Sequence, residues 1–102
     1  MIVYNSAFAI ADDLDPWEFL SLVKQQYLNP AVETGYFSGY TVLGLLRADH
    51  GDPGSTFACQ LHTSSIDKID VFESEEKDRL DAVLNKKFGE RCLSFITVLG
   101  QL

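Results

Sequence analysis

Four short segments of the chain carry strand-type patterns of apolar and polar residues, and two longer segments between them carry helical spacing. Residues 2–11 alternate between a heavy apolar set and a small or polar set, which is typical of a strand with one buried face. The other strand-type segments are residues 37–46, 56–63 and 92–99. The pattern predicts strand, helix, strand and then, after a turn, strand, helix, strand again.

The first helical segment begins with a capping sequence. Asp15 is placed as the N-cap, Pro16 occupies the first helical position, and Glu18 is spaced to complete a capping box. Apolar residues then recur at spacings of three and four and predict a stripe that covers a sheet. The stripe is Trp17, Leu20, Val23, Tyr27 and Leu28. Because Pro30 removes a backbone donor, we expect the helix to end near Leu28 and a new turn to start at Asn29.

The second helical segment follows the third strand, with Ser64 or Ser65 as its cap. Its apolar positions fall into two groups on either side of a polar run, residues 73–79, so we expect a kink or a break near Ser74. Those positions are Ile66, Ile69, Phe72, Leu80, Val83, Leu84 and Phe88. Gly89 is placed to end the helix.

The order of elements predicts one α+β domain over residues 1–102. Residues 1–46 and 56–102 form two strand–helix–strand halves, and the turn-forming residues 47–55 join them. This arrangement is typical of the ferredoxin-like split βαβ fold, β-α-β-β-α-β, with strand order 4-1-3-2 in a four-stranded antiparallel sheet. Both helices then lie on one face of the sheet, and the other face is left open.

The open face is predicted to be small and semi-polar, which favours coverage by a second copy of the chain. On the phase that buries the heavier residues, the first and third strands place a common set there. That set is Val3, Asn5, Ala7, Ala9, Ala58, Gln60 and His62. We expect a homodimer closed by a two-fold axis, a dimeric α+β barrel. The alternative is a monomer with a solvated sheet face.

Charge and cysteine content limit the classes of partner and the cellular compartment that we expect for this chain. Lys and Arg number 8 and Asp and Glu 15, so the net charge of −7 repels nucleic acid and anionic membranes. The first residues lack the basic and apolar regions of a signal peptide, and a cytoplasmic protein is expected. A strand separates Cys59 from Cys92 by roughly 10 Å, so we expect both thiols to be free.

His62 is the candidate with the most useful chemistry. A strand histidine near Asn5 and Gln60 has the groups for acid/base work or for polarising a carbonyl. The simpler interpretation is a hydrogen-bonded histidine in an interface, because no acidic partner that would orient the ring is identified. Likewise, Asn5 and Gln60 are expected to pair between strands unless they contact a ligand.

Two further groups carry weaker signals. Tyr4, Trp17 and Tyr40 are candidates, with Gln60, for lining a small-molecule site, although aromatic residues of this kind more often form the core. Asp49, His50 and Asp52 have metal-ligating side chains, but their spacing matches no calcium loop and the adjacent glycines and proline indicate a turn. We therefore predict no metal and no cofactor.

Four segments carry a resemblance to a known family: MIVYN, NPAVETGYFSGYTVLGLL, STFACQLHTSS and KKFGERCLSFITVL. The chain resembles a family of bacterial, Bacteroidetes-type domains of unknown function and of about this length. The resemblance spans essentially the whole chain and implies a ferredoxin-like dimeric α+β barrel. It implies no reaction, because the family has no assigned activity.

Taken together, these patterns favour a non-enzymatic domain with a binding or interaction role. No glycine-rich phosphate loop and no nucleophile elbow occurs, which argues against nucleotide-binding enzymes and α/β hydrolases. One alternative is a cofactor-independent monooxygenase or isomerase that acts on a small organic molecule in a pocket between sheet and helices, with His62 and Asn5 at the reaction site. Another is a ligand-sensing regulatory module. The acidic run, residues 73–78, is a docking surface or simply a solvated helix face.

Overall fold

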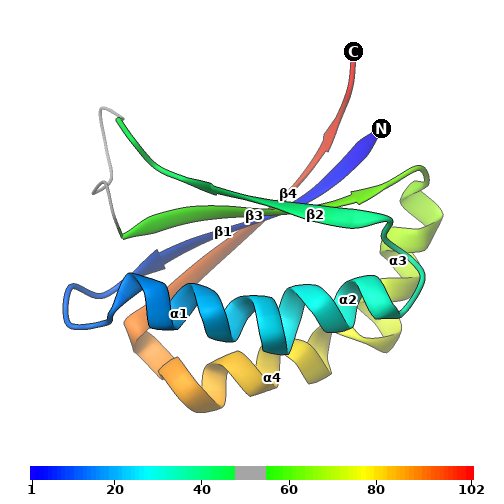
Figure 1. The fold of residues 1–102 in the computed structure, drawn as a ribbon. Helices are drawn as coiled ribbons and strands as arrows, with labels where there is room; N and C mark the ends of the chain where they lie inside the picture. Colours follow the sequence, from blue (N-terminus) through cyan, green and yellow to red (C-terminus); the bar gives the residue numbers. More distant parts are fainter. Residues whose placement is uncertain (48–54) are drawn as a thin grey trace.

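The strands form one antiparallel sheet with all helices on one side of it (Figure 1). This computed structural model describes residues 1–47 and 55–102. The strands are β1 (Ile2–Ile10), β2 (Gly39–Gly44), β3 (Thr56–Thr63) and β4 (Cys92–Gly100). Their order across the sheet is β2-β3-β1-β4, and every neighbouring pair is antiparallel. The predicted ferredoxin-like topology is confirmed.

The helical layer has two parts, one from each half of the chain. The first is a continuous rod of three segments, α1 (Pro16–Val23), a π-helical turn η1 (Lys24–Leu28) and α2 (Asn29–Glu33). The second contains α3 (Ile66–Glu75) and α4 (Lys77–Phe88), and a short 3-10 turn, η2 (Gly89–Arg91), leads into β4. Both parts lie below the sheet in Figure 1, and the upper face of the sheet has no helix over it.

Strand alternation decides which side chains enter the core. Even-numbered residues of β1 and odd-numbered residues of β3 are buried against the helices, as the predicted phase requires. The largest buried side chains come from both layers and include aromatic rings in contact. They are Tyr4, Phe8, Phe19, Tyr27, Phe37, Phe57, Phe72 and Phe88. Cys59 and Cys92 are both free, and β1 lies between their strands, as predicted.

The first helix differs from prediction at its C-terminal end. It does not stop at Leu28; it continues through Asn29 and Pro30, and Asn29 has helical φ and ψ of −62° and −45°. A regular α-helix would need the missing amide of Pro30 to donate to the carbonyl four residues before it. The π turn just ahead of Pro30 changes that hydrogen-bonding pattern, so the rod runs on to Glu33. Gly35 follows the rod with φ of 86°, a conformation that glycine adopts readily at a helix end.

Trp17 is not part of the buried stripe, and its side chain is 80% exposed. Leu14 and Phe19 occupy the core side of the helix start, with Phe19 only 1% exposed. The stripe is therefore set by Phe19, Val23 and the residues after them rather than by Trp17. With Asp15 as the N-cap, Leu14 and Phe19 occupy the two positions of a hydrophobic staple, and their packing on the core fixes the rotation of the first turn.

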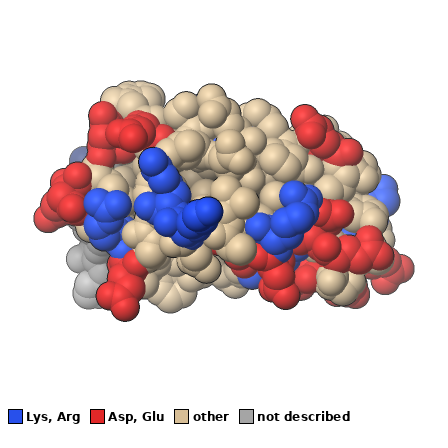
Figure 2. All heavy atoms as spheres, turned by 90° about the horizontal axis from the view of Figure 1, so that it is seen from below, with Lys and Arg blue, Asp and Glu red and all other residues tan. Residues whose placement is uncertain are grey.

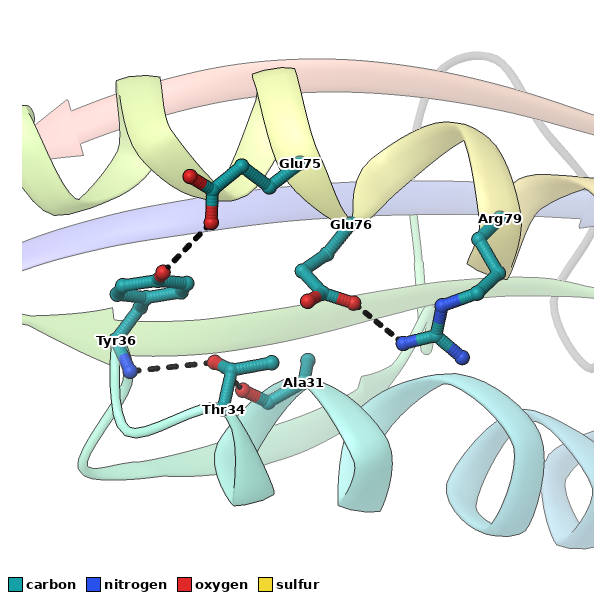
Figure 3. A network of polar contacts seen from close by, with 6 residues as sticks. All are labelled: Ala31, Thr34, Tyr36, Glu75, Glu76 and Arg79. Carbon is teal, nitrogen blue, oxygen red and sulfur yellow. Dashed lines mark hydrogen bonds and ion pairs between the residues drawn. The ribbon is translucent and has the colours of Figure 1, made fainter.

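The second helical segment is interrupted at Glu76, between α3 and α4, close to the predicted kink. Polar contacts connect this interruption to the residues that follow α2 (Figure 3). The Tyr36 hydroxyl donates to Glu75 at 2.9 Å, and the Tyr36 amide donates to the Thr34 hydroxyl at 3.2 Å. Arg79 pairs with Glu76. In the same run, Glu73 accepts from the Tyr4 hydroxyl. Part of the acidic run thus joins elements within the chain, and the run as a docking surface stays untested.

Asp15 provides a first prediction, because its side chain caps α1 by accepting from the Trp17 amide at 2.9 Å. Replacing Asp15 by alanine leaves that amide without its partner, so we expect the free energy of unfolding to fall by about 1 kcal/mol. Urea denaturation measures the change. Asp12→Ala, in the same exposed loop, is the control, and equal losses in both variants would contradict a capping role.

Candidate functional site

The face of the sheet turned away from the helices carries none of the chain's Asp, Glu, Lys or Arg in its described strands. This absence is unusual, because 23% of all residues are charged. Strand register and alternation place one set of side chains on this face, hereafter the open face. It consists of Val3, Asn5, Ala7, Ala9, Gly39, Thr41, Leu43, Thr56, Ala58, Gln60, His62, Leu93, Phe95, Thr97 and Leu99. Its chemistry is hydrogen bonding and apolar contact.

Large apolar side chains on the two edge strands are strongly exposed on the open face. Leu93, Phe95 and Leu99 of β4 are 59%, 64% and 48% exposed, and Leu43 of β2 is 50% exposed. Smaller side chains lie between them on the central strands. A continuous surface of this kind in a monomer is typical of an interaction site.

A polar row crosses the open face from one edge to the other. The register places Thr41 of β2 opposite Gln60 of β3, Gln60 opposite Asn5 of β1, and Asn5 opposite Thr97 of β4. The Asn5 amide donates to the Thr97 hydroxyl at 3.2 Å. The polar row is therefore one structure built from all four strands. Sequence reasoning found Asn5 and Gln60 but missed Thr41 and Thr97, whose signal is a threonine within an otherwise apolar strand.

His62 lies next to the polar row, and Thr41 of that row orients its ring. Its Nε2 is 2.8 Å from the Thr41 hydroxyl, across β2 and β3. Two polar atoms here, His62 Nδ1 and Asn5 Oδ1, are buried and have no hydrogen-bond partner among residues 1–47 and 55–102. Buried polar atoms are nearly always paired, so these two are exceptions, and solvent does not reach them in the single chain.

The predicted ligand-lining residues do not come together. Gln60 is on the open face, whereas Tyr4 is fully buried on the helix side and donates to Glu73 at 2.9 Å. Tyr40 pairs with Leu61 and so lies on the helix side too, and Trp17 is exposed on α1. Burial raises the pKa of Tyr4, and the neighbouring Tyr27 and Glu73 add to the effect, so this hydroxyl remains a donor.

The predicted pocket between sheet and helices is a poor match for His62 and Asn5. Both project from the opposite face, and aromatic side chains fill the helix side beneath them. A small hollow of about 80 Å³ does lie on the helix side, near Phe8, Asp81 and Ser94, away from His62. Any chemistry of His62 must therefore take place on the open face.

The metal hypothesis is untested. Asp49, His50 and Asp52 lie outside the residues that the structure describes. Within the described ranges, no group of His, Cys, Asp or Glu is arranged to hold an ion.

The whole chain matches the sequence model of one protein family. The profile of the domain of unknown function DUF4286 matches residues 1–102. The chain belongs to the DUF4286 family. The expected membership in a family of small domains of unknown function is confirmed. Curated protein sequences contain no match to this DUF4286 chain.

Solved structures with the same fold are distant in sequence. A protein of the ethyl tert-butyl ether d (EthD) family from Bacillus halodurans has a TM-score of 0.67 and 12% identity, and the match covers 100% of both chains. A proposed antibiotic biosynthesis monooxygenase from Bordetella bronchiseptica has a TM-score of 0.67 and 10% identity, over 99% of this chain and 97% of the other. A de novo designed ferredoxin-fold protein has a TM-score of 0.51 and 15% identity, over 100% and 88%. At these identities the matches establish the fold alone.

No helix in the described part of the chain is long and apolar enough to cross a membrane bilayer.

Proposed function

We propose that this DUF4286 domain works as a homodimer whose copies pack their open faces together, in a non-enzymatic binding or interaction role. The observation that carries the proposal is the open face itself, which has no charged side chain and exposes Leu43, Leu93, Phe95 and Leu99. Removing apolar surface from water is favourable by roughly 25 cal/mol per Å². A second copy that covers these side chains would gain that free energy.

A second copy of the chain suits the open face better than an unrelated partner. Asn5 and Gln60 carry amides, which both donate and accept, so identical polar rows are able to pair with each other. The exposed Leu93, Phe95 and Leu99 find apolar counterparts on the same face of the other copy. An unrelated partner with a charged surface would instead bury charges without partners against the open face.

Two-fold symmetry also closes the assembly. In a two-fold dimer each copy uses the same surface, so no second open face remains to recruit further copies. This matters for β4, an edge strand with exposed apolar side chains, because such strands otherwise promote aggregation.

Light scattering of the purified protein tests the proposal. We expect the mass of two chains at micromolar concentration. Phe95→Glu places a charge on the open face opposite Ala7, and we expect it to weaken dimerisation at least tenfold, because a charge buried without a partner is strongly unfavourable.

Trp17→Glu is the control, since Trp17 is an aromatic residue at least as exposed as Phe95 but lies on α1, across the molecule from the open face. Circular dichroism confirms that both variants fold. A wild-type monomer, or a Phe95→Glu protein as dimeric as Trp17→Glu, would refute the homodimer.

The second candidate is a cofactor-independent monooxygenase or isomerase with His62 and Asn5 at its site. One observation favours it: the Thr41 hydroxyl, 2.8 Å from His62 Nε2, orients the ring on the open face. One fold neighbour, from Bordetella bronchiseptica, is named as an antibiotic biosynthesis monooxygenase, which supports the same alternative. Oxygen-uptake assays with small organic substrates test it, and turnover that is lost in a folded, dimeric His62→Ala protein would establish this alternative.

A ligand-sensing module is the third possibility, supported by the small polar row between apolar edges.

The free thiols of Cys59 and Cys92 suit a reducing compartment, so we place the protein in the cytoplasm.

A further inference from the structure

A groove on the helix side of the molecule is separate from the open face. It has a volume of about 330 Å³ and runs between the first helical rod and α4. Its apolar lining comes from Leu22 of α1 and from Val83, Leu84 and Phe88 of α4. Ligand pockets in proteins begin at about 300 Å³, so the groove has room for one small, slender molecule.

The π turn η1 shapes one wall of the groove. Gln26, in the middle of η1, is one of the lining residues. A π turn is wider than an α-helical turn and is frequently found at functional sites. Here the turn precedes Pro30 and places an amide, able to donate hydrogen bonds, at the edge of the apolar lining.

Two lysines complete the edge. Lys86 and Lys87, in the last turn of α4, both line the groove. Neither forms an ion pair within residues 1–47 and 55–102, whereas Lys77, Arg79 and Arg91 do. Figure 2 shows this side of the molecule, where basic side chains border large uncharged areas.

The position of the lysines is partly explained by α4 itself. Cations at a helix C-terminus interact favourably with the helix dipole, by about 0.3–1 kcal/mol each. That effect does not explain why they border an apolar groove, nor why a chain with a net charge of −7 leaves both unpaired there. Two full positive charges also exceed the partial negative charge of the helix end. Lys87 also lines an adjoining hollow with Asp13, Asp15 and Glu18, whereas Lys86 lines only the apolar groove, so Lys86 is the main attraction for an anion.

We propose that this groove binds a small amphiphilic carboxylate, with its alkyl chain along Leu22, Val83 and Phe88 and its carboxylate at Lys86 and Lys87. Gln26 donates a further hydrogen bond to the carboxylate. The proposal is independent of the homodimer, because the groove and the open face lie on opposite sides of the sheet–helix sandwich.

Titration of the protein with decanoate, followed by two-dimensional amide NMR, tests the proposal. We expect saturable shifts at the groove, centred on residues 22–26 and 83–88. Lys86→Glu combined with Lys87→Glu should weaken binding at least tenfold, because the carboxylate then faces two negative charges. Lys68→Glu, an unpaired exposed lysine on α3, is the control and should bind as the wild type does.

Two further measurements keep the result interpretable. Decanol, with the same chain and no charge, should bind the wild type at least tenfold more weakly than decanoate. Val83→Glu places a charge in the apolar lining and should abolish the binding of decanoate. This variant takes the place of the double lysine variant if the double variant does not fold. Shifts confined to the open face, no saturation, or unchanged affinity in the folded lysine variant would each overturn the proposal.

Discussion

Replacement of Phe72 by alanine is expected to lower the free energy of unfolding by about 3–5 kcal/mol, the usual cost of removing a buried aromatic ring. Phe72 has no exposed surface. Its ring packs edge-on against Phe37 at 4.9 Å and against Tyr4 at 5.7 Å between centroids, so one side chain of α3 joins the helix layer to β1. Domains of this size are stable by about 5–15 kcal/mol, so the loss is a large fraction of the total.

Urea denaturation of Phe72→Ala measures the effect, with Val71→Ala as the control. Val71 is the preceding residue of the same helix and is 37% exposed, so its loss should cost less than half as much. Both substitutions change helix propensity in the same direction, toward alanine. Similar losses in the two variants would mean that the aromatic cluster around Phe72 does not stabilise the core as the packing implies.

Alkaline solution is expected to destabilise the fold through Cys59. Burial raises the pKa of the Cys59 thiol from 9.0 to about 12, with Lys24 lowering it slightly and Cys92 raising it. Since the folded pKa is above the unfolded one, the folded state holds its proton more tightly. This contribution is complete below pH 9 and is lost as the pH rises toward 12. At pH 10 the loss amounts to about 1 kcal/mol, and at pH 11 to about 3 kcal/mol.

The unfolding free energy between pH 8 and pH 10 checks this slope. Burial also raises the pKa of Cys92, to about 11, but Cys92 is only partly buried and contributes less. In Cys59→Ala we therefore expect at least half of the alkaline slope to disappear, whatever the variant costs at neutral pH. Tyr27, whose pKa burial also raises, adds to the loss only above pH 10. An unchanged slope in Cys59→Ala would show that its thiol is not protected from ionisation.

The sequence predicted the fold almost completely, because each element is specified by local signals. The alternation in β1 and β3 is fixed by residues two apart, so the buried phase follows from Tyr4, Phe8 and Leu61 without knowledge of the neighbours. The cap at Asp15 and the positive φ of Gly35 and Gly89 are likewise local. The open face was predicted for the same reason, since it is the other half of the alternation.

Only the tertiary structure decided how residues from different strands meet. The polar row depends on register, which joins Thr41, Gln60, Asn5 and Thr97 over sequence separations of up to 92 residues, and no periodicity within one strand reveals it. The exposure of Trp17 depends on the packing of Phe19 beneath the sheet. The unpaired Asn5 Oδ1 and His62 Nδ1, and the groove beside η1, arise from burial and from backbone geometry around Pro30. Local patterns determine which elements form and which face each residue takes, whereas sites require the contacts that packing creates between them.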